Sequence, residues 1–252
     1  MERKVVVITG ASRGLGKNMA LHLADQGRDI ILTYRSKESE AAEVVSQIEK
    51  KGGKALALQL DVSKSSTFEG FAGALRSALQ KNWSRDQFDY LINNAGMGVY
   101  APFAETTEAQ FDELMNTHFK GTFFLTQKLL PLIKNGGRIL NVSSGLARFA
   151  TPGYSAYASM KGGIETLTRY LAKELGPRKI SVNVIAPGAI ETDFGGGVVR
   201  DNAELNKFIA SQTALGRVGL PDDIGGAVAA LLSDDVHWMT GQRIEVSGGM
   251  FI

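Results

Sequence analysis

The chain has 252 residues, 44% of them hydrophobic, which suits one large α/β domain with a substantial core. Lysine and arginine total 28 against 26 aspartates and glutamates, and no block of basic residues occurs, so the composition argues against nucleic-acid or anionic-membrane binding and favours work on a small molecule. The chain has no cysteine, which excludes disulfides, thiolate metal sites and cysteine nucleophiles.

The first predicted strand covers residues 4–9, and since no signal-peptide pattern precedes it, we expect a cytoplasmic protein. A glycine-rich turn, residues 10–16, and a helical pattern follow. Glycines permit positive φ and let the backbone approach a pyrophosphate, whose charge is met by the amides and dipole of the helix start. The spacing Gly-x-x-x-Gly-x-Gly differs from the Gly-x-Gly-x-x-Gly fingerprint, so the turn alone predicts either a dinucleotide site or merely a tight connection.

The second predicted strand, residues 29–34, bears on the choice of cofactor. In dinucleotide-binding folds an acidic residue near the end of this strand binds the ribose hydroxyls of NAD. Here Arg35 and Ser36 follow the strand, and Arg13 lies in the glycine turn. Because no carboxylate would repel a phosphate and both arginines could reach one, the sequence favours NADPH over NADH. The alternative is that Arg35 is an ordinary exposed loop residue.

The elements that follow alternate between helix and strand. Helices are predicted at residues 39–51, 65–80, 107–134 and 202–211, around Tyr157 up to about residue 177, and from residue 221. Strands are predicted at residues 54–60, 88–92, 138–142, 180–185 and 242–246. This alternation predicts a single Rossmann domain over residues 1–252: a doubly wound, mostly parallel, seven-stranded sheet with helices on both faces.

Polar turns follow the third and fourth strands. Asp61, at the end of the third, could cap the next helix or accept the adenine amino group. Residues 93–96, Asn-Asn-Ala-Gly, form a turn whose amides satisfy the backbone or a cofactor. Asn116 lies within the predicted helix 107–134. Asparagine is unfavourable there and often bonds backbone groups, so it marks either a local break or a tolerated exposed position.

The central stretch, residues 143–161, carries the strongest chemical signal. Ser144 follows a buried strand and is therefore delivered to the carboxyl edge of the sheet, where ligands bind in open α/β folds. Tyr157 and Lys161 are four residues apart and share one helix face. An ammonium beside a phenol favours the phenolate, so Lys161 is expected to lower the pKa of Tyr157 and make it a proton donor and acceptor near neutral pH. The alternative is a surface helix with an extended lysine.

The last third of the chain contributes a turn and a candidate lid. After strand 180–185, a rigid turn leads to residues that face the crevice: Pro187, Gly188, Ile190 and Thr192. Three consecutive glycines, 195–197, then form a flexible joint. A hinged segment beside the strand ends predicts a substrate lid at about residues 189–216, with an ordinary mobile loop as the alternative. The three histidines are scattered without ligand spacing, so no metal site is expected.

Taken together, these motifs resemble the classical short-chain dehydrogenases/reductases over essentially the whole length. The resemblance rests on residues 9–16, Asp61-Val62, residues 93–96, Asn116, Ser144, residues 157–161, Pro187-Gly188 and Thr192, in the order and spacing of the family. Each motif is weak alone, but jointly they are specific, and they imply a hydride-transferring oxidoreductase. The remote alternative is a non-catalytic dinucleotide-binding regulator. Such a protein would be expected to lack one of the catalytic residues, but Asn116, Ser144, Tyr157 and Lys161 are all present.

The resemblance also implies roles for single residues. Tyr157 would protonate a substrate carbonyl oxygen that Ser144 also hydrogen-bonds. Lys161 would lower the tyrosine pKa and hold the nicotinamide ribose, and Asn116 would anchor a water that leads protons to Lys161. The implied cofactor contacts are Gly10, Ser12, Arg13, Gly14, Leu15, Gly16, Arg35, Ser36, Asp61, Val62, Asn93, Ala95, Gly96, Tyr157, Lys161, Pro187, Gly188, Ile190 and Thr192.

Within the family, the chain looks most like bacterial 3-oxoacyl-(acyl carrier protein) reductases. Such enzymes usually present basic residues beside the cleft, a role that Lys134, Arg178 and Lys179 could take here. Asn135 and Ser247 depart from the pattern common in these reductases. The leading expectation is therefore an NADPH-dependent reductase that converts a ketone to a secondary alcohol, with the carrier-protein reductase as the alternative.

The family commonly assembles as tetramers through its long helices, so a homotetramer or a dimer is expected. Phe123, Phe124 and Leu125 lie on such a helix and are expected either near an interface or in the ordinary core.

Overall fold

Seven stretches of β-branched and aliphatic residues form one sheet in the computed structural model, which describes residues 3–252. The strands are β1 (Val5–Ile8), β2 (Asp29–Tyr34), β3 (Ala55–Gln59), β4 (Phe88–Asn93), β5 (Ile133–Val142), β6 (Ser181–Pro187) and β7 (Arg243–Val246). They lie in the order β3-β2-β1-β4-β5-β6-β7, and every neighbouring pair is parallel. The predicted seven-stranded Rossmann sheet is confirmed.

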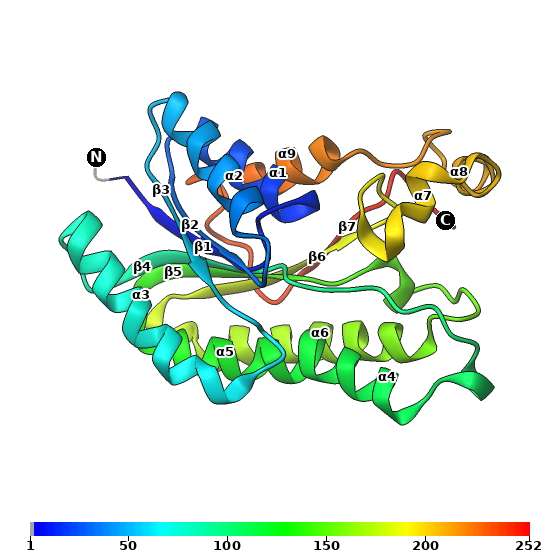
Figure 1. Cartoon of the computed structure of the whole chain (residues 1–252), viewed down its shortest axis with the longest axis horizontal. Helices are drawn as coiled ribbons and strands as arrows, with labels where there is room; N and C mark the ends of the chain where they lie inside the picture. The colour runs from blue at the N-terminus through cyan, green and yellow to red at the C-terminus, as the bar shows by residue number, and fades with distance from the viewer. Residues whose placement is uncertain (1–2) are drawn as a thin grey trace.

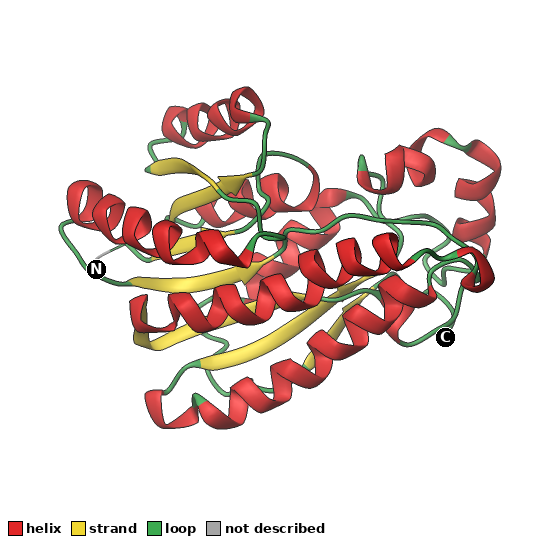
Figure 2. Cartoon of the chain, turned by 60° about the horizontal axis from the view of Figure 1, so that its bottom comes forward, coloured by secondary structure: helices red, strands yellow, loops and turns green. Residues whose placement is uncertain are grey.

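Helices cover both faces of this sheet. Figure 1 shows α1 (Gly14–Asp25), α2 (Glu38–Lys50) and α9 (Pro221–Leu231) on one face. The other face carries α3 (Phe68–Trp83), α4 (Glu108–Leu114), α5 (Gly121–Leu129) and α6 (Ser155–Glu174). Figure 2 views the molecule from the side of this second layer, whose helices lie side by side in front of the strands.

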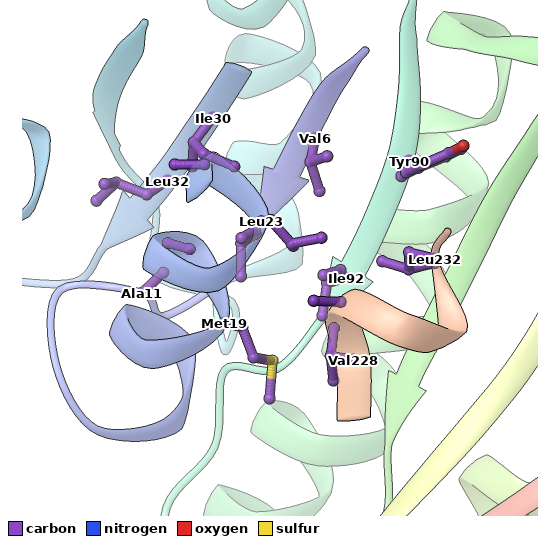
Figure 3. Packing of buried hydrophobic residues seen from close by; sticks show 14 of the residues in the cluster. Val6, Ala11, Met19, Leu23, Ile30, Leu32, Tyr90, Ile92, Val228 and Leu232 are labelled. Atoms are coloured by element: carbon purple, nitrogen blue, oxygen red, sulfur yellow. The ribbon is translucent and has the colours of Figure 1, made fainter. Parts of the chain in front are cut away.

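The core forms two layers, one on each side of the sheet, because alternate strand residues point to opposite faces. Val6, Ile30 and Ile92 face α1 and α9, where Met19, Leu23 and Val228 meet them; Figure 3 shows this packing. The neighbouring residues Val5, Val7 and Ile31 belong to the opposite layer with α3 and α5. Burial of both strand faces explains why the strands are almost continuously apolar.

One predicted helix was too long. Residues 107–134 form α4, a π-helix (Met115–Lys120), α5 and a short 3₁₀ turn (Leu130–Leu132), and β5 already begins at Ile133. Pro131 lies in that 3₁₀ turn, and since it has no backbone N–H, it favours the end of the helix. Helix α4 begins with a capping box: the Thr107 hydroxyl accepts from the Gln110 N–H, and the Gln110 side chain accepts from the Thr107 N–H. The π-helix contains Asn116, so the local break suspected there exists.

The carboxyl ends of the parallel strands all meet one edge of the sheet, which we call the carboxyl edge. The strand order runs outward in opposite directions from β1 and from β4, so the switch point of the topology lies between these two strands. In open α/β sheets of this kind, ligands bind in the crevice at the switch point. Beyond this edge lie α7 (Val198–Asp201), which the sequence did not predict, and α8 (Ala203–Ser211) (Figure 1).

Candidate active site

The glycine turn packs directly against the turn after β4. Gly10 has φ +63°, and a Cβ there would lie 2.8 Å from the Ala95 Cα. A Cβ on Gly16 would lie 2.4 Å from the Gly10 carbonyl oxygen and 2.5 Å from the Asn94 amide nitrogen. A side chain at either glycine would push the two turns apart. These glycines therefore keep the first turn of α1 and the turn after β4 in close contact at the carboxyl edge.

Asn94 holds the two turns together by hydrogen bonds, and we call this contact the clamp. Asn94 was not among the predicted cofactor contacts, although its neighbours in the turn 93–96 were. Its side-chain amide donates to the Thr9 and Gly10 carbonyls at 2.9 and 3.0 Å. In return, the Thr9 hydroxyl accepts from the backbone N–H groups of Asn94 and Ala95, both at 3.0 Å. The asparagine pair in the sequence was the available signal, since turn asparagines commonly bond the backbone.

The turn after β6 lies opposite the glycine turn. A Cβ on Gly14 would lie 3.9 Å from the Thr192 Cβ, so residues 178 positions apart in the chain face each other. Thr192 is buried, and its hydroxyl accepts from the Phe194 N–H at 3.2 Å. Gly188, just after β6, has no room for a side chain beside Ser247. Between these turns, the open N-terminus of α1 is built to receive an anion, which fits a dinucleotide pyrophosphate.

Arg35 and Asp61 stand together at the ends of β2 and β3. Their side chains form an ion pair at 3.4 Å, and Arg35 is largely exposed. Asp61 also accepts from the Ser63 N–H and hydroxyl at 3.0 and 2.7 Å, which makes it a turn cap. Although burial opposes it, these hydrogen bonds and the Arg35 charge lower the pKa of Asp61. An exposed pair contributes at most about 1 kcal/mol, so Arg35 can leave Asp61 for a phosphate at little cost.

Tyr157, Lys161 and Ser144 gather at the carboxyl edge as expected. Tyr157 and Lys161 lie one turn apart on α6, with 6% and 5% of their surface exposed. The Lys161 Nζ lies 5.6 Å from the centre of the Tyr157 ring and donates to the Val142 carbonyl at 2.7 Å. The Ser144 hydroxyl hydrogen-bonds the phenol and accepts from the Leu146 N–H. The three side chains form one cluster at the end of β5, in which Tyr157 and Lys161 are buried and Ser144 is half-buried.

The expected lowering of the Tyr157 pKa is wrong for this structure. Burial raises the pKa of Tyr157 above its ordinary value, and the hydrogen bond with Ser144 offsets this only in part. Burial also lowers the pKa of Lys161 to about 7. The helical spacing correctly placed the two side chains together, but it could not show that both are buried. Loss of water around the charged forms outweighs their attraction.

Buried polar contacts behind the cluster hold it in place. Asn93 donates to the Asn141 side chain at 2.8 Å and to the Thr126 hydroxyl at 2.9 Å, so it joins β4 to β5 and α5. Asn141 in turn donates to the Thr168 hydroxyl on α6 at 2.9 Å. These bonds tie β4, β5, α5 and α6 together behind the cluster.

The backbone at Ser144 is fixed by ion pairs that involve β7. Arg243 binds Glu165 at 2.7 Å and Glu245 at 2.8 Å, and one of its nitrogens approaches the Ser144 carbonyl at 3.4 Å. Ser143 donates to the same Glu165 at 2.7 Å. No local pattern predicts this network, because its members come from three distant segments of the chain.

A buried histidine completes the cluster on the side of the π-helix. The His118 ring meets the Tyr157 ring edge-on at 5.1 Å, with 89° between the planes. Its Nε2 lies 2.7 Å from the Met97 carbonyl and 3.2 Å from the Met97 nitrogen. The Asn116 side chain makes no hydrogen bond to any part of the chain from residue 3 onward, while its carbonyl accepts the Gly121 N–H that closes the π-turn. Among these contacts, none brings the Asn116 side chain to Tyr157 or Lys161.

The three basic residues expected beside the cleft lie elsewhere. Lys134 is near the start of β5, and Arg178 and Lys179 immediately precede β6. Parallel strands begin at one edge of a sheet and end at the other, so these residues lie at the edge opposite the carboxyl edge, where Tyr157 lies. Arg178 is moreover bound to Asn135 at 2.8 Å and to the Leu130 carbonyl at 2.9 Å.

Acid should destabilise the protein through His118. Burial, and then the nearby Lys161 charge, lower its pKa to about 3, against about 6.5 when unfolded. The unfolded chain therefore binds more protons between pH 6.5 and 3, and stability falls as the pH falls through this window. At pH 5 the expected loss is about 2 kcal/mol relative to pH 7.5.

Urea unfolding at pH 7.5 and pH 5 measures this loss. The His118→Gln variant should show a loss smaller by about the same 2 kcal/mol, whereas the matched control His237→Gln, at an exposed histidine, should behave like the parent. An identical pH dependence in His118→Gln and the parent would contradict the prediction.

Across residues 3–252, no cluster of three or more histidine, aspartate or glutamate side chains is arranged to hold a metal ion. Within the same residues, no helix is both long and apolar enough to cross a bilayer.

A parallel sheet with a glycine turn at its first strand and a buried Tyr-Lys pair at its carboxyl edge defines a Rossmann oxidoreductase. A family model described as "Enoyl-(Acyl carrier protein) reductase" matches residues 10–251. The chain belongs to the short-chain dehydrogenase/reductase family.

Known proteins of this kind align over nearly the whole chain. An uncharacterised oxidoreductase of Methylorubrum extorquens is 38% identical over 250 residues, which cover 99% of this chain and 98% of that protein. The hydroxynaphthalene reductase-like protein Arp2 of Metarhizium anisopliae is 36% identical over 257 residues, covering 98% and 94%. The crystal structure of the angucycline C-6 ketoreductase LanV with bound NADP superposes with a TM-score of 0.93 at 34% identity, covering 98% and 95%.

Proposed function

We propose that this protein reduces an aromatic ketone to a secondary alcohol with NADPH. The observation that carries the proposal is the buried phenol of Tyr157, which hydrogen-bonds Ser144, lies one helical turn from Lys161 and faces the same edge as the glycine turn. The carbonyl reductases among the relatives support the same reaction class.

Each side chain then has a distinct task. Tyr157 donates its proton to the substrate carbonyl oxygen, and Ser144 donates a hydrogen bond to the same oxygen. When bound, NADPH supplies the hydride for the carbonyl carbon. Because burial raises the pKa of Tyr157, the phenol stays protonated at neutral pH and is ready to act as an acid. Lys161, with a pKa lowered to about 7, can return a proton near neutrality, and its ammonium form stabilises the developing phenolate.

The glycine turn and the turn after β6 are the proposed cofactor cradle. Gly10, Gly14 and Gly16 leave the backbone N–H groups of α1 open to the pyrophosphate. Arg35, at the end of β2, would bind the 2′-phosphate of NADPH with Arg13, and the NADP bound by LanV supports this choice over NADH.

Changing Arg35 to aspartate should shift the preference from NADPH towards NADH. The substitution removes a phosphate ligand and places a carboxylate where it can bind ribose hydroxyls, so the NADPH/NADH ratio of kcat/KM should fall about 100-fold. The matched control, Arg76→Asp, makes the same charge change at an exposed position of α3 and should leave the ratio unchanged. A parental ratio in Arg35→Asp would show that this arginine does not bind the phosphate.

Aromatic side chains around Tyr157 support aromatic substrates. Phe194 lies with its ring 5.8 Å from that of Tyr157, and 44% of its surface is exposed. Tyr100 packs edge-on to Tyr154 at 5.5 Å. Such faces stack on planar ligands better than on flexible aliphatic ones. The hydroxynaphthalene and angucycline reductases among the relatives support the same substrate class.

A substrate panel tests the proposed function. NADPH oxidation is followed with bicyclic aromatic ketones, simple aliphatic ketones and an acetoacetyl thioester, free or on acyl carrier protein. We expect the highest kcat/KM for the aromatic ketones. A stronger preference for the carrier-bound thioester would instead support the fatty-acid reductase, and no reduction of any member would favour the non-catalytic regulator.

Phe194 should contribute to this preference. Phe194→Leu should raise KM for a bicyclic ketone about fivefold while changing that for an aliphatic ketone little, because it removes one stacking face worth about 1 kcal/mol. Phe208→Leu, at an exposed position of α8, is the control. Equal effects on both ketones would remove Phe194 from the substrate site.

The lid predicted at about residues 189–216 remains a proposal. Both ends of this segment are tied down: the Glu191 N–H donates to the Gly219 carbonyl at 3.0 Å, and the Leu215 N–H donates to the Gly248 carbonyl at 3.0 Å. Between them, Gly195, Gly196 and Gly197 all have positive φ, and the first two have open space around them. A hinge at these glycines would move the rest of the segment relative to Phe194, whose ring already lies 5.8 Å from that of Tyr157.

The assembly state and the location also remain proposals. Phe123 and Phe124 are 38% and 42% exposed on α5, whereas Leu125 is in the core. The exposed pair would suit the interface of a homotetramer or a dimer. The cytoplasmic location expected from the sequence stays a prediction.

A further inference from the structure

The short turn that follows Ser144 is held by an arginine at its far end. The Ala147 N–H donates to the Ser144 carbonyl at 3.1 Å, and the Arg148 N–H donates to the Gly145 carbonyl at 2.8 Å. Residues 144–148 thus form one compact turn, which we call the serine turn, and the Ser144 hydroxyl stands at its start. Because the turn is compact, a displacement of Arg148 also displaces this hydroxyl.

Glu245 of β7 is the residue on which the contacts of the serine turn converge. Its backbone is fixed in the sheet, where it pairs with Ala186 of β6. Its two carboxylate oxygens accept from the Arg148 guanidinium, both at 2.7 Å. One of them also accepts from Arg243 and the other from the Ser247 hydroxyl, both at 2.8 Å. A bidentate contact between arginine and carboxylate fixes orientation as well as distance, so Glu245 holds Arg148 in one place.

Arg243 connects the same carboxylate to the other end of the serine turn. Besides Glu245, its guanidinium binds Glu165 on α6 at 2.7 Å and approaches the Ser144 carbonyl at 3.4 Å. Helix α6 is the helix that carries the proposed acid. Glu245 is therefore linked to both ends of the serine turn, at Arg148 directly and at Ser144 through Arg243, and the second link is shared with α6.

The charge of Glu245 allows the two arginines to share this place. Arg148 and Arg243 are close enough for their like charges to act on each other. Although burial opposes it, the hydrogen bonds from both arginines and from Ser247 lower the pKa of Glu245 to about 2, so the carboxylate is ionised at neutral pH. A neutral side chain at position 245 would leave two guanidinium groups that repel each other, and the more exposed Arg148 would move away with its turn.

Ser247 belongs to the same arrangement. The sequence departs at this position from the aspartate that is common in carrier-protein reductases. An aspartate there would place a second carboxylate against Glu245, whereas the serine hydroxyl donates to Glu245 at 2.8 Å. A serine at position 247 therefore fits an ionised Glu245 beside it.

We propose that Glu245 is a positioning residue for ketone reduction: through Arg148 and Arg243 it sets where the Ser144 hydroxyl stands relative to Tyr157. This inference rests on the proposed function. Ser144 hydrogen-bonds the carbonyl oxygen as negative charge develops there, so its position matters most in the transition state. Glu245 acts on turnover through Ser144 alone and takes no part in proton or hydride transfer.

Glu245→Gln is the variant that tests this role. Glutamine keeps the length of the side chain but removes its charge, so repulsion between Arg148 and Arg243 loosens the serine turn. We expect kcat for ketone reduction to fall about 10- to 100-fold, as for a small misplacement of a reacting group, while ketone KM and NADPH affinity stay close to those of the parent. A parental kcat, or a rise in KM with kcat unchanged, overturns the proposal.

A double variant separates positioning from a general structural effect. In the Ser144→Ala background, Glu245→Gln should lower kcat little further, because both changes remove the same hydrogen bond to the carbonyl oxygen. Equal losses with and without the Ser144 hydroxyl overturn the proposal. The matched control is Glu69→Gln, which removes the carboxylate charge from the exposed ion pair with Lys128 and should leave kcat unchanged.

Hydrogen exchange tests the structural link without any activity. The Arg148 and Phe149 N–H groups both donate to the Gly145 carbonyl, and in Glu245→Gln they should exchange about tenfold faster than in the parent and in Glu69→Gln. Unchanged exchange overturns the proposal even if every tested ketone is inert. Faster exchange in a protein that reduces no ketone would contradict the proposed function, while it would support the link between Glu245 and the serine turn.

If Glu245→Gln does not fold, Arg148→Lys takes its place in both measurements. Lysine keeps the positive charge but cannot hold both carboxylate oxygens in a fixed orientation. We expect a loss of kcat with unchanged KM that is absent in the Ser144→Ala background, and additive losses overturn the proposal.

Discussion

Replacing Tyr157 by phenylalanine is expected to lower kcat by about two to four orders of magnitude, which is the usual contribution of a positioned acid. The hydroxyl group is the only part removed. The ring contacts with His118 at 5.1 Å and with Phe194 at 5.8 Å are available to phenylalanine as well, so the fold and the cofactor site should persist. NADPH affinity, measured by fluorescence titration, should therefore stay close to that of the parent.

Tyr170→Phe is the matched control for this change. Tyr170 lies on the same helix, α6, but is 64% exposed, so its hydroxyl can be removed without effect on turnover. Activity of Tyr157→Phe within a few-fold of Tyr170→Phe would reject Tyr157 as the acid. Loss of NADPH binding together with activity would instead indicate that the phenol is needed to form the site.

Replacing Gly16 by alanine is expected to weaken NADPH binding about 10- to 100-fold and to lower the free energy of unfolding by about 1–3 kcal/mol. The added Cβ would lie 2.4 Å from the Gly10 carbonyl oxygen and 2.5 Å from the Asn94 amide. Both are parts of the clamp between the glycine turn and the turn after β4, so relief of the contact must widen the cradle. Isothermal titration with NADPH and urea unfolding measure the two effects.

Gly70→Ala is the control that measures how a glycine-to-alanine change alters stability when the added Cβ meets no neighbour. Gly70 lies in α3, is exposed, and has nothing within 4 Å of an added Cβ, so alanine should stabilise the helix by about 0.5–1 kcal/mol and leave NADPH affinity unchanged. If Gly16→Ala bound NADPH as tightly as Gly70→Ala, the glycine turn would not be the pyrophosphate site.

Much of the fold could be predicted because its signals are local. Alternation of apolar strands with helical patterns led to the parallel sheet, and β2 was predicted with its observed bounds, Asp29–Tyr34. The predictions failed where a boundary depends on neighbours. Residues 133 and 134 were assigned to a helix, but Ile133 pairs with Phe88 of β4, and this pairing is invisible in the local pattern.

In the candidate site, too, features set within one element could be predicted, whereas features set by distant segments could not. The sequence by itself determined that a glycine turn follows the first strand, that Ser144 ends a strand and that Tyr157 and Lys161 share a helix face, because spacing along one element fixes these relations. Only the tertiary structure decided that burial raises the Tyr157 pKa, and that the His118 ring meets its ring edge-on. Desolvation and packing depend on which distant segments cover a residue, and this information is set by the assembled fold.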